Sequence, residues 1–81
     1  MFKRIWRFSV ANKLITLYRK HDFEGLQAFW TRFKAFPRED QQNIIMRTSA
    51  VLASHFPAEH QILEGDLMRY GFVDENFEWR L

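Results

Sequence analysis

Residues 23–36 read FEGLQAFWTRFKAF, and their large apolar side chains recur at the three- and four-residue spacing of an α-helix. One arc of that helix holds all of them, namely Phe23, Leu26, Phe29, Trp30, Phe33 and Phe36, with Gln27, Thr31, Arg32 and Lys34 on the far side. Burial is worth about 2 kcal/mol for each large apolar side chain. We therefore expect this stripe, with Phe29 and Phe33 at its centre, to form a ridge that the rest of the chain covers.

The length and composition predict one small domain spanning residues 1–81. A chain of this size buries only about 60–65% of its unfolded surface, and without cysteine it has neither disulfides nor thiolate metal sites to stabilise it. An aromatic content of 17% compensates, because each Phe or Trp buries about 150–250 Å². The sequence has no apolar run of the roughly 20 residues that a membrane span needs and no signal-peptide pattern, so we expect a cytoplasmic protein.

The periodicity elsewhere predicts an all-α fold, a compact antiparallel four-helix bundle with a short C-terminal turn. The expected helices span residues 10–20, 23–35, 37–55 and 57–70, after a basic and aromatic lead-in at 1–9 and before a C-terminal segment at 72–81. Asp22 is placed to cap the second helix, and Gly71 is placed to end the fourth. Pro37 and Pro57 are placed to begin the third and fourth helices.

The third predicted helix has apolar side chains on two faces. One face holds Ile44, Ile45, Val51, Leu52 and Phe56, and the opposite face holds Met46, Ala50 and Ala53. Such a pattern is typical of a central helix, so we expect neighbouring helices to cover both faces.

Charge is distributed unevenly along the chain. Residues 1–20 contain six basic residues, Lys3, Arg4, Arg7, Lys13, Arg19 and Lys20, and no acidic residue. Residues 39–81 contain eight acidic residues against three arginines, although the net charge of the whole chain is only +2. This polarity favours either ion pairing within the chain or an anionic partner for the basic end.

The three histidines do not have the spacing of a metal site. His21, His55 and His60 lack the i, i+4 spacing that places two ligands on one helical face, so we interpret them as surface or capping residues. The alternative is a metal held across the corner between the last two helices by His55, Glu59 and His60. We expect no metal and no cofactor.

Nucleophilic catalysis is not predicted either. Ser9, Ser49 and Ser54 have no local motif that supplies a base. Glu64 and Asp66 are spaced i, i+2 and point to different sides of a helix, so we interpret them as solvated surface acids. We therefore expect a protein without enzymatic activity.

The basic and aromatic stretch FKRIWRF, residues 2–8, is the feature most suggestive of function. Alternating cations and aromatic rings suit an acidic protein groove, nucleic acid or an anionic membrane, whereas burial of Ile5, Trp6 and Phe8 would place the stretch in the core. A membrane is disfavoured because the run is only about two turns long, and no nucleic-acid-binding motif is recognisable. The candidate partner-binding residues are Lys3, Arg4, Trp6, Arg7, Arg19 and Lys20.

Residues 14–55, and a shorter stretch near the C-terminal end, resemble the Hha/YmoA family of small helical bacterial proteins. The matching pieces are Leu17-Tyr18-Arg19-Lys20, a capped helix with Leu26 and Trp30, Glu39-Asp40-Gln41 leading into Ile44-Ile45-Met46-Arg47, and Gly65-Asp66-Leu67 through Gly71 and Val73. The resemblance implies modulation of a nucleoid-associated silencing protein such as H-NS by protein–protein contact. Thr48-Ser49-Ala50-Val51-Leu52 replaces the family's central Ala-Ala-Asp-His-Arg motif, so the family's charged contact is assigned to no residue here.

These observations favour a non-enzymatic interaction module that regulates or inhibits a larger intracellular assembly by docking on an acidic protein surface. The alternative is direct binding of nucleic acid by the basic N-terminal segment. The sequence leaves open whether copies of the chain associate into a homo-oligomer.

Overall fold

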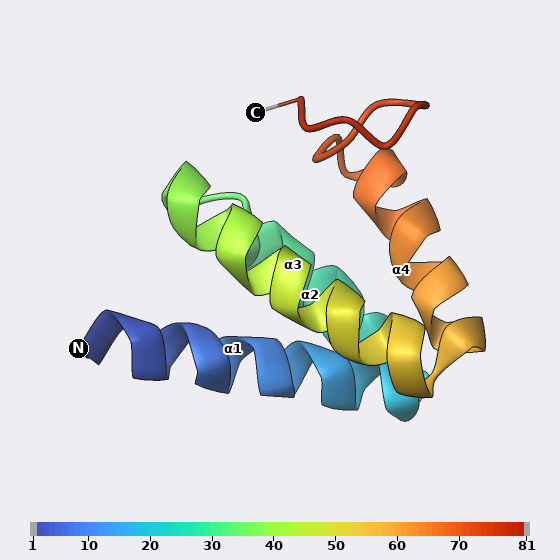
Figure 1. Cartoon of the computed structure of the whole chain (residues 1–81), viewed down its shortest axis with the longest axis horizontal. Helices are drawn as coiled ribbons and strands as arrows, with labels where there is room; N and C mark the ends of the chain where they lie inside the picture. The colour runs from blue at the N-terminus through green and yellow to red at the C-terminus, as the bar shows by residue number, and fades with distance from the viewer. Residues whose placement is uncertain (1, 81) are drawn as a thin grey trace.

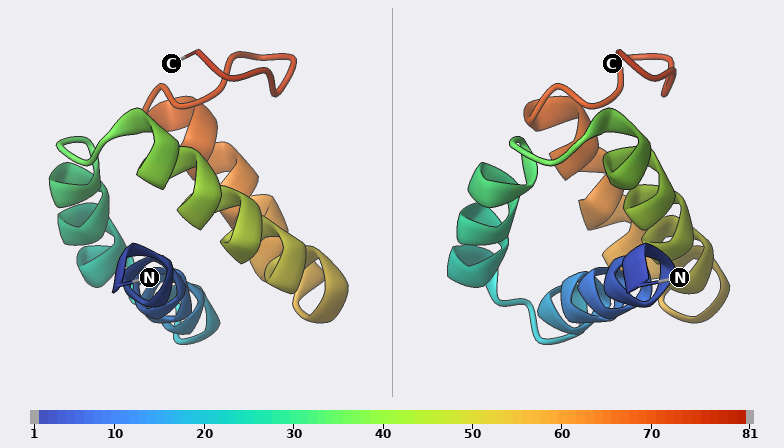
Figure 2. Two further views of the ribbon diagram at one scale, coloured as in Figure 1. Left: turned by 60° about the vertical axis from the view of Figure 1, so that its left-hand side comes forward. Right: turned by 90° about the vertical axis from the view of Figure 1, so that its left-hand side faces the viewer.

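The computed structural model describes residues 2–80 and, for Phe2 and Lys3, only their place in a helix. The chain forms four helices, α1 (Phe2–Arg19), α2 (Phe23–Phe33), α3 (Arg38–His55) and α4 (Pro57–Arg69). Figures 1 and 2 show α1 and α2 on one side of the bundle, α3 beside α4, and the C-terminal segment lying across the end where α3 begins. The predicted all-α four-helix bundle is confirmed. None of the described helices has both the length and the apolarity required to cross a membrane.

The apolar face of α2 is covered by α1 and by residues that follow α4. Leu26, Trp30 and Phe33 are fully or almost fully buried. The ring of Phe72 lies 5.3 Å from that of Trp30 and 5.4 Å from that of Phe33, and Tyr70 stacks on Trp30 at 5.9 Å. The segment after α4 therefore covers the central side chains of the predicted ridge.

Three aromatic residues of the predicted ridge are less buried than expected. Phe29 and Phe36 are only partly buried, and Phe23 is 59% exposed. Phe36 lies beyond the end of α2, and Phe23 is its first residue, with a ring that faces His21 at the edge of the bundle. The expectation that Phe29 is as central to the core as Phe33 was wrong, because Phe29 lies at the margin of the covered face.

Helix α1 runs without interruption, so residues 2–9 belong to the same helix as residues 10–19 and do not form a separate lead-in. The two halves of α1 pack against different parts of the molecule. Ala11, Leu14 and Tyr18 are buried in the core, whereas the ring of Trp6 meets that of Phe36 at a centroid distance of 5.1 Å. The apolar side chains in the two halves of α1 meet different neighbours, so one continuous stripe is not required.

Helix α3 is central, with α1 and α4 packed against it. The expectation that a neighbour covers Met46, Ala50 and Ala53 was wrong, since all three are exposed. The buried face of α3 instead includes polar residues that find partners. Thr48 donates to the carbonyl of Ile44, one turn earlier in the same helix, at 2.8 Å.

Asp66 is buried, which contradicts its interpretation as a solvated acid. The hydroxyl of Tyr18 donates to Asp66 Oδ2 at 2.6 Å and so connects α1 to α4. Burial raises the pKa of the Tyr18 phenol well above its ordinary value, and the hydrogen bond to Asp66 and the charge of that carboxylate act in the same direction.

We expect Phe33→Ala to lower the free energy of unfolding by about 3–5 kcal/mol, because the ring is fully buried. Phe29→Ala is the matched control, one turn earlier on α2 and only partly buried, and should cost clearly less. Thermal and denaturant melts measure the stability loss of both variants. In a domain of this size, each kcal/mol lost lowers the melting temperature by about 4–8 °C. Equal losses in the two variants would contradict the packing of α2.

The raised pKa of Tyr18 makes stability depend on alkaline pH. In the unfolded chain the phenol ionises near pH 10. The contribution of Tyr18 to folding is therefore fully present below about pH 10 and is lost as the pH rises toward the folded-state pKa. Denaturant melts between about pH 9 and pH 12 should show a shallower decline in Tyr18→Phe than in the wild type. Tyr70→Phe is the control variant. If stability fell with pH equally in Tyr18→Phe and Tyr70→Phe, the raised pKa would not belong to Tyr18.

Candidate functional site

A basic pocket lies between the N-terminal half of α1 and the middle of α3. Its volume is about 460 Å³, and it is lined by Arg4 and Arg7 from α1 and by Asn43 and Arg47 from α3. In each helix the lining residues are three or four positions apart, so they share one face. We name this site the arginine pocket.

Arg7 is held in place by a buried carboxylate. Its Nε and one terminal nitrogen both lie 2.7 Å from Asp40 Oδ1, and the same terminal nitrogen lies 3.7 Å from the exposed Glu39. The side chain of Asp40 is 3% exposed and lies in the first turn of α3, where the helix dipole favours a negative charge. Asp40 therefore orients the Arg7 guanidinium at the wall of the pocket.

Arg47 is oriented by an aromatic ring. Its guanidinium carbon lies 5.1 Å from the centroid of the Phe8 ring, which is 49% exposed. Among the described residues, neither Arg4 nor Arg47 forms an ion pair with a carboxylate. Their guanidinium N–H groups are therefore available to an anion that enters the pocket.

The structure distributes the six predicted partner-binding residues over separate places. Arg4 and Arg7 line the arginine pocket, and Trp6, which is 39% exposed, leans on Phe36. The side chain of Lys3 lies outside the described part of the chain. Arg19 and Lys20 lie at the opposite end of α1, about 22 Å from Arg4 along the helix axis at 1.5 Å per residue. The guanidinium of Arg19 packs there over the ring of Phe56 at 4.8 Å.

Sequence reasoning missed the contribution of α3 to this site. Asn43 and Arg47 lie about 40 residues from Arg4 and Arg7 in the chain, and no local pattern connects them. The one available signal is that Arg47 is among the few cations of the acidic C-terminal half.

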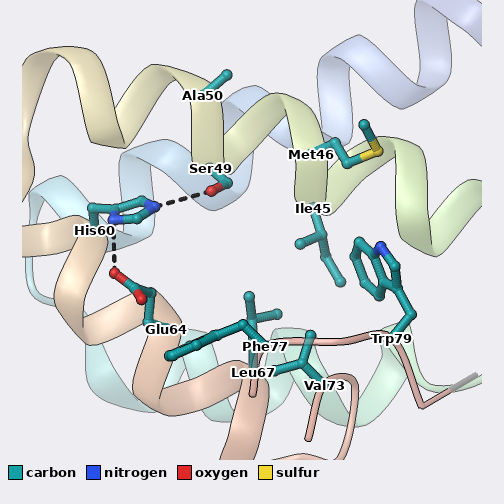
Figure 3. Close-up of a pocket in the computed structure, with 10 residues that line it drawn as sticks. All are labelled: Ile45, Met46, Ser49, Ala50, His60, Glu64, Leu67, Val73, Phe77 and Trp79. Atoms are coloured by element: carbon teal, nitrogen blue, oxygen red, sulfur yellow. Dashed lines mark hydrogen bonds and ion pairs between the residues drawn. The ribbon is translucent and has the colours of Figure 1, made fainter. Parts of the chain in front are cut away.

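A second pocket, of about 430 Å³, lies between α3, α4 and the C-terminal segment (Figure 3). Apolar side chains form most of its wall, with Ser49, His60 and Glu64 together at one end. The apolar lining residues are Ile45, Met46, Ala50, Leu67, Val73, Phe77 and Trp79. We name this site the α3–α4 pocket.

The polar end of the α3–α4 pocket is a chain of two short contacts. Ser49 Oγ lies 2.9 Å from His60 Nε2, and His60 Nδ1 lies 3.0 Å from Glu64 Oε1. An ionised Glu64 can only accept a hydrogen bond, so it places the proton of a neutral His60 on Nδ1. His60 Nε2 is then an acceptor, and the Ser49 hydroxyl donates to it.

This grouping was not predicted from the sequence. His60 and Glu64 have the i, i+4 spacing of a helical pair, which is a signal that sequence analysis could have used. Ser49 comes from α3, and only the packing of α3 on α4 brings it to His60. Glu64 was expected to be solvated, and its side chain is in fact partly covered and paired.

The residues described by the structure include no group of three or more histidine, cysteine, aspartate or glutamate side chains that could hold a metal ion. His55 and His60 lie on either side of the corner between α3 and α4, and His60 is engaged by Ser49 and Glu64. The alternative metal site at His55, Glu59 and His60 is therefore not formed.

Comparisons with protein-family models, with curated proteins and with solved structures found no match. The function of this chain is therefore inferred from the geometry and charge of the two pockets.

The contact between Arg7 and Asp40 is testable by itself. Hydrogen bonds to charged groups contribute about 1.5–3 kcal/mol each to stability. We expect a double-mutant cycle of Arg7→Met and Asp40→Asn to give a coupling energy in this range from denaturant melts at neutral pH. The matched control is the pair Arg69 and Asp66, whose shortest contact is 3.8 Å and whose arginine is mostly exposed. A coupling no larger than that of the control would contradict the orienting role of Asp40.

Proposed function

We propose that this chain is a small cytoplasmic interaction module that docks on an acidic protein surface through the arginine pocket and so regulates a larger assembly. The observation that supports the proposal is the cluster of three guanidinium groups at one site. Arg4 and Arg47 form no ion pair with another described residue, and Arg7 is already oriented by Asp40.

The surroundings of the arginine pocket favour a protein partner. Ile5 is 63% exposed and lies next to Arg4, and Phe8 lies one turn further along α1. Apolar side chains beside arginine are typical of protein interfaces, in which arginine and aromatic residues contribute much of the binding energy. Carboxylates of the partner would pair with Arg4 and Arg47, while its apolar side chains would cover Ile5 and Phe8.

Nucleic acid is the second candidate, because the same guanidinium groups suit phosphates. One feature favours a protein partner over nucleic acid. An exposed apolar side chain such as Ile5 gains nothing from contact with phosphates, whereas the apolar side chains of a protein partner would cover it. The resemblance to the Hha and YmoA proteins would make the protein partner a nucleoid-associated protein, and this stays a prediction.

The docking proposal is tested by capturing partners from the native cell with wild-type protein and two charge variants as baits. In the first bait, Arg4→Glu and Arg47→Glu reverse the two unpaired charges of the arginine pocket. In the control bait, Arg19→Glu and Lys20→Glu make the same change in net charge at the other end of α1. We expect the wild type and the control to capture the same protein and the first bait to lose it, with affinity reduced at least about thirtyfold, or about 2 kcal/mol. Equal capture by the two variants would contradict docking at the arginine pocket.

Mobility-shift titrations with duplex DNA separate the two candidates. Binding of about three phosphates by Arg4, Arg7 and Arg47 would give a slope near −3 in a plot of log affinity against log salt concentration. We expect no shift at micromolar protein in low salt. A shift with that slope that Arg4→Glu and Arg47→Glu abolish would favour nucleic acid as the partner.

A further inference from the structure

We propose that Ser49 is a nucleophile, activated by His60, that accepts a small apolar acyl group from an ester bound in the α3–α4 pocket. The proposal concerns a different face of α3 from the docking proposal and does not depend on it. It goes against the expectation of a protein without enzymatic activity, which was based on local sequence motifs.

The first support is the order of the three polar groups. Nucleophilic catalysis needs a hydroxyl in hydrogen-bond contact with a base, and a third group that orients the base. Ser49 Oγ and His60 Nε2 are 2.9 Å apart, and Glu64 Oε1 lies 3.0 Å from His60 Nδ1 (Figure 3). The carboxylate of Glu64 sets the tautomer in which Nε2 can take the hydroxyl proton, so Glu64 is a positioning residue.

The second support is that helices hold all three groups. Ser49 lies in the middle of α3, and His60 and Glu64 lie one turn apart on α4. Only Phe56 separates the two helices, which limits their movement relative to each other. Sites built on helices hold their side chains more firmly than sites built on loops.

The third support is the apolar space beside the hydroxyl. Ile45 precedes Ser49 by one turn of α3, Leu67 follows Glu64 by almost one turn of α4, and all of them line the pocket. Phe77 and Trp79 line the pocket from the C-terminal segment (Figure 3). A volume of about 430 Å³ lies within the range of small-molecule sites, about 300–1,000 Å³. The walls therefore suit a short aliphatic or aromatic acyl group.

The reaction proceeds in two balanced steps. Ser49 Oγ forms a bond to the ester carbonyl carbon while its proton passes to His60 Nε2, and His60 gives that proton to the departing alkoxide as the old C–O bond breaks. Water then attacks the acyl-serine, again losing a proton to His60 Nε2. The carboxylic acid leaves as the proton returns to Ser49 Oγ. One ester and one water thus give one acid and one alcohol.

The site supplies little stabilisation for the oxyanion. The backbone N–H groups of Ser49 and Ala50 lie inside α3, where helical hydrogen bonds to carbonyls one turn earlier occupy them. Loss of a single oxyanion donor costs about 10²–10³ in rate in enzymes that have one. We therefore expect slow turnover, limited to esters with good leaving groups such as p-nitrophenyl butyrate.

The test is covalent labelling with a fluorophosphonate probe, in which the serine oxygen displaces fluoride from phosphorus. Mass spectrometry of the intact full chain should show one adduct, and peptide mapping should place it on Ser49. Ser49→Ala should abolish the adduct, whereas Ser54→Ala, which removes an exposed serine of the same helix, should leave it unchanged. Alanine favours a helix more than serine does, so we expect Ser49→Ala to remain folded.

Two further variants test the roles of the base and of the carboxylate. His60→Gln should slow labelling about 100-fold or more, the usual contribution of a general base. Glu64→Gln should slow it about tenfold, and Glu64→Asp should recover part of the rate. An adduct that persists in Ser49→Ala, or a labelling rate that His60→Gln leaves unchanged, would overturn the proposal. Hydrolysis of p-nitrophenyl butyrate at the same rate by wild type and Ser49→Ala would overturn it as well.

Discussion

Burial of the Trp30 ring governs how the other helices are arranged. Its ring is completely covered, and part of that cover comes from residues far along the chain. Tyr70 and Phe72 provide that cover, which requires α4 to run back along α3 until its end reaches α2. Gly71 lies between them with a φ of 81°, a conformation that glycine adopts without strain, and this allows both rings to meet Trp30.

Buried polar contacts then determine how α1 sits on the other helices. Tyr18 reaches Asp66 near the end of α4, and Arg7 reaches Asp40 at the start of α3. Both contacts join the basic first helix to the acidic C-terminal half, so part of the uneven charge of the sequence is used within the molecule. A buried carboxylate that lost its partner would cost several kcal/mol, so sliding or turning α1 is strongly disfavoured. Arg4 and Arg47, which line the arginine pocket, form no ion pair with another described residue and so remain available to a partner.

Helix α3 contributes to both candidate sites through pairs of residues one turn apart. Asn43 and Arg47 face α1 and complete the arginine pocket, whereas Ile45 and Ser49 face α4 and the C-terminal segment. This arrangement explains why α3 has no single apolar face. Its polar side chains are distributed between the buried side and two different pockets.

Local features of the chain specify the number and type of the helices, because helical periodicity, Asp22 as a cap, and the two prolines act over a few residues. They also identify the central part of the core, with Leu26, Trp30 and Phe33. Which apolar residues are covered depends on the packing of whole helices, since Phe23 and Met46 follow the helical pattern and yet remain exposed. Both pockets likewise required the tertiary structure. Arg47 lies near Arg4, and Ser49 contacts His60, because α3 packs against α1 and α4. The spacing of residues in the sequence does not reveal such contacts between helices.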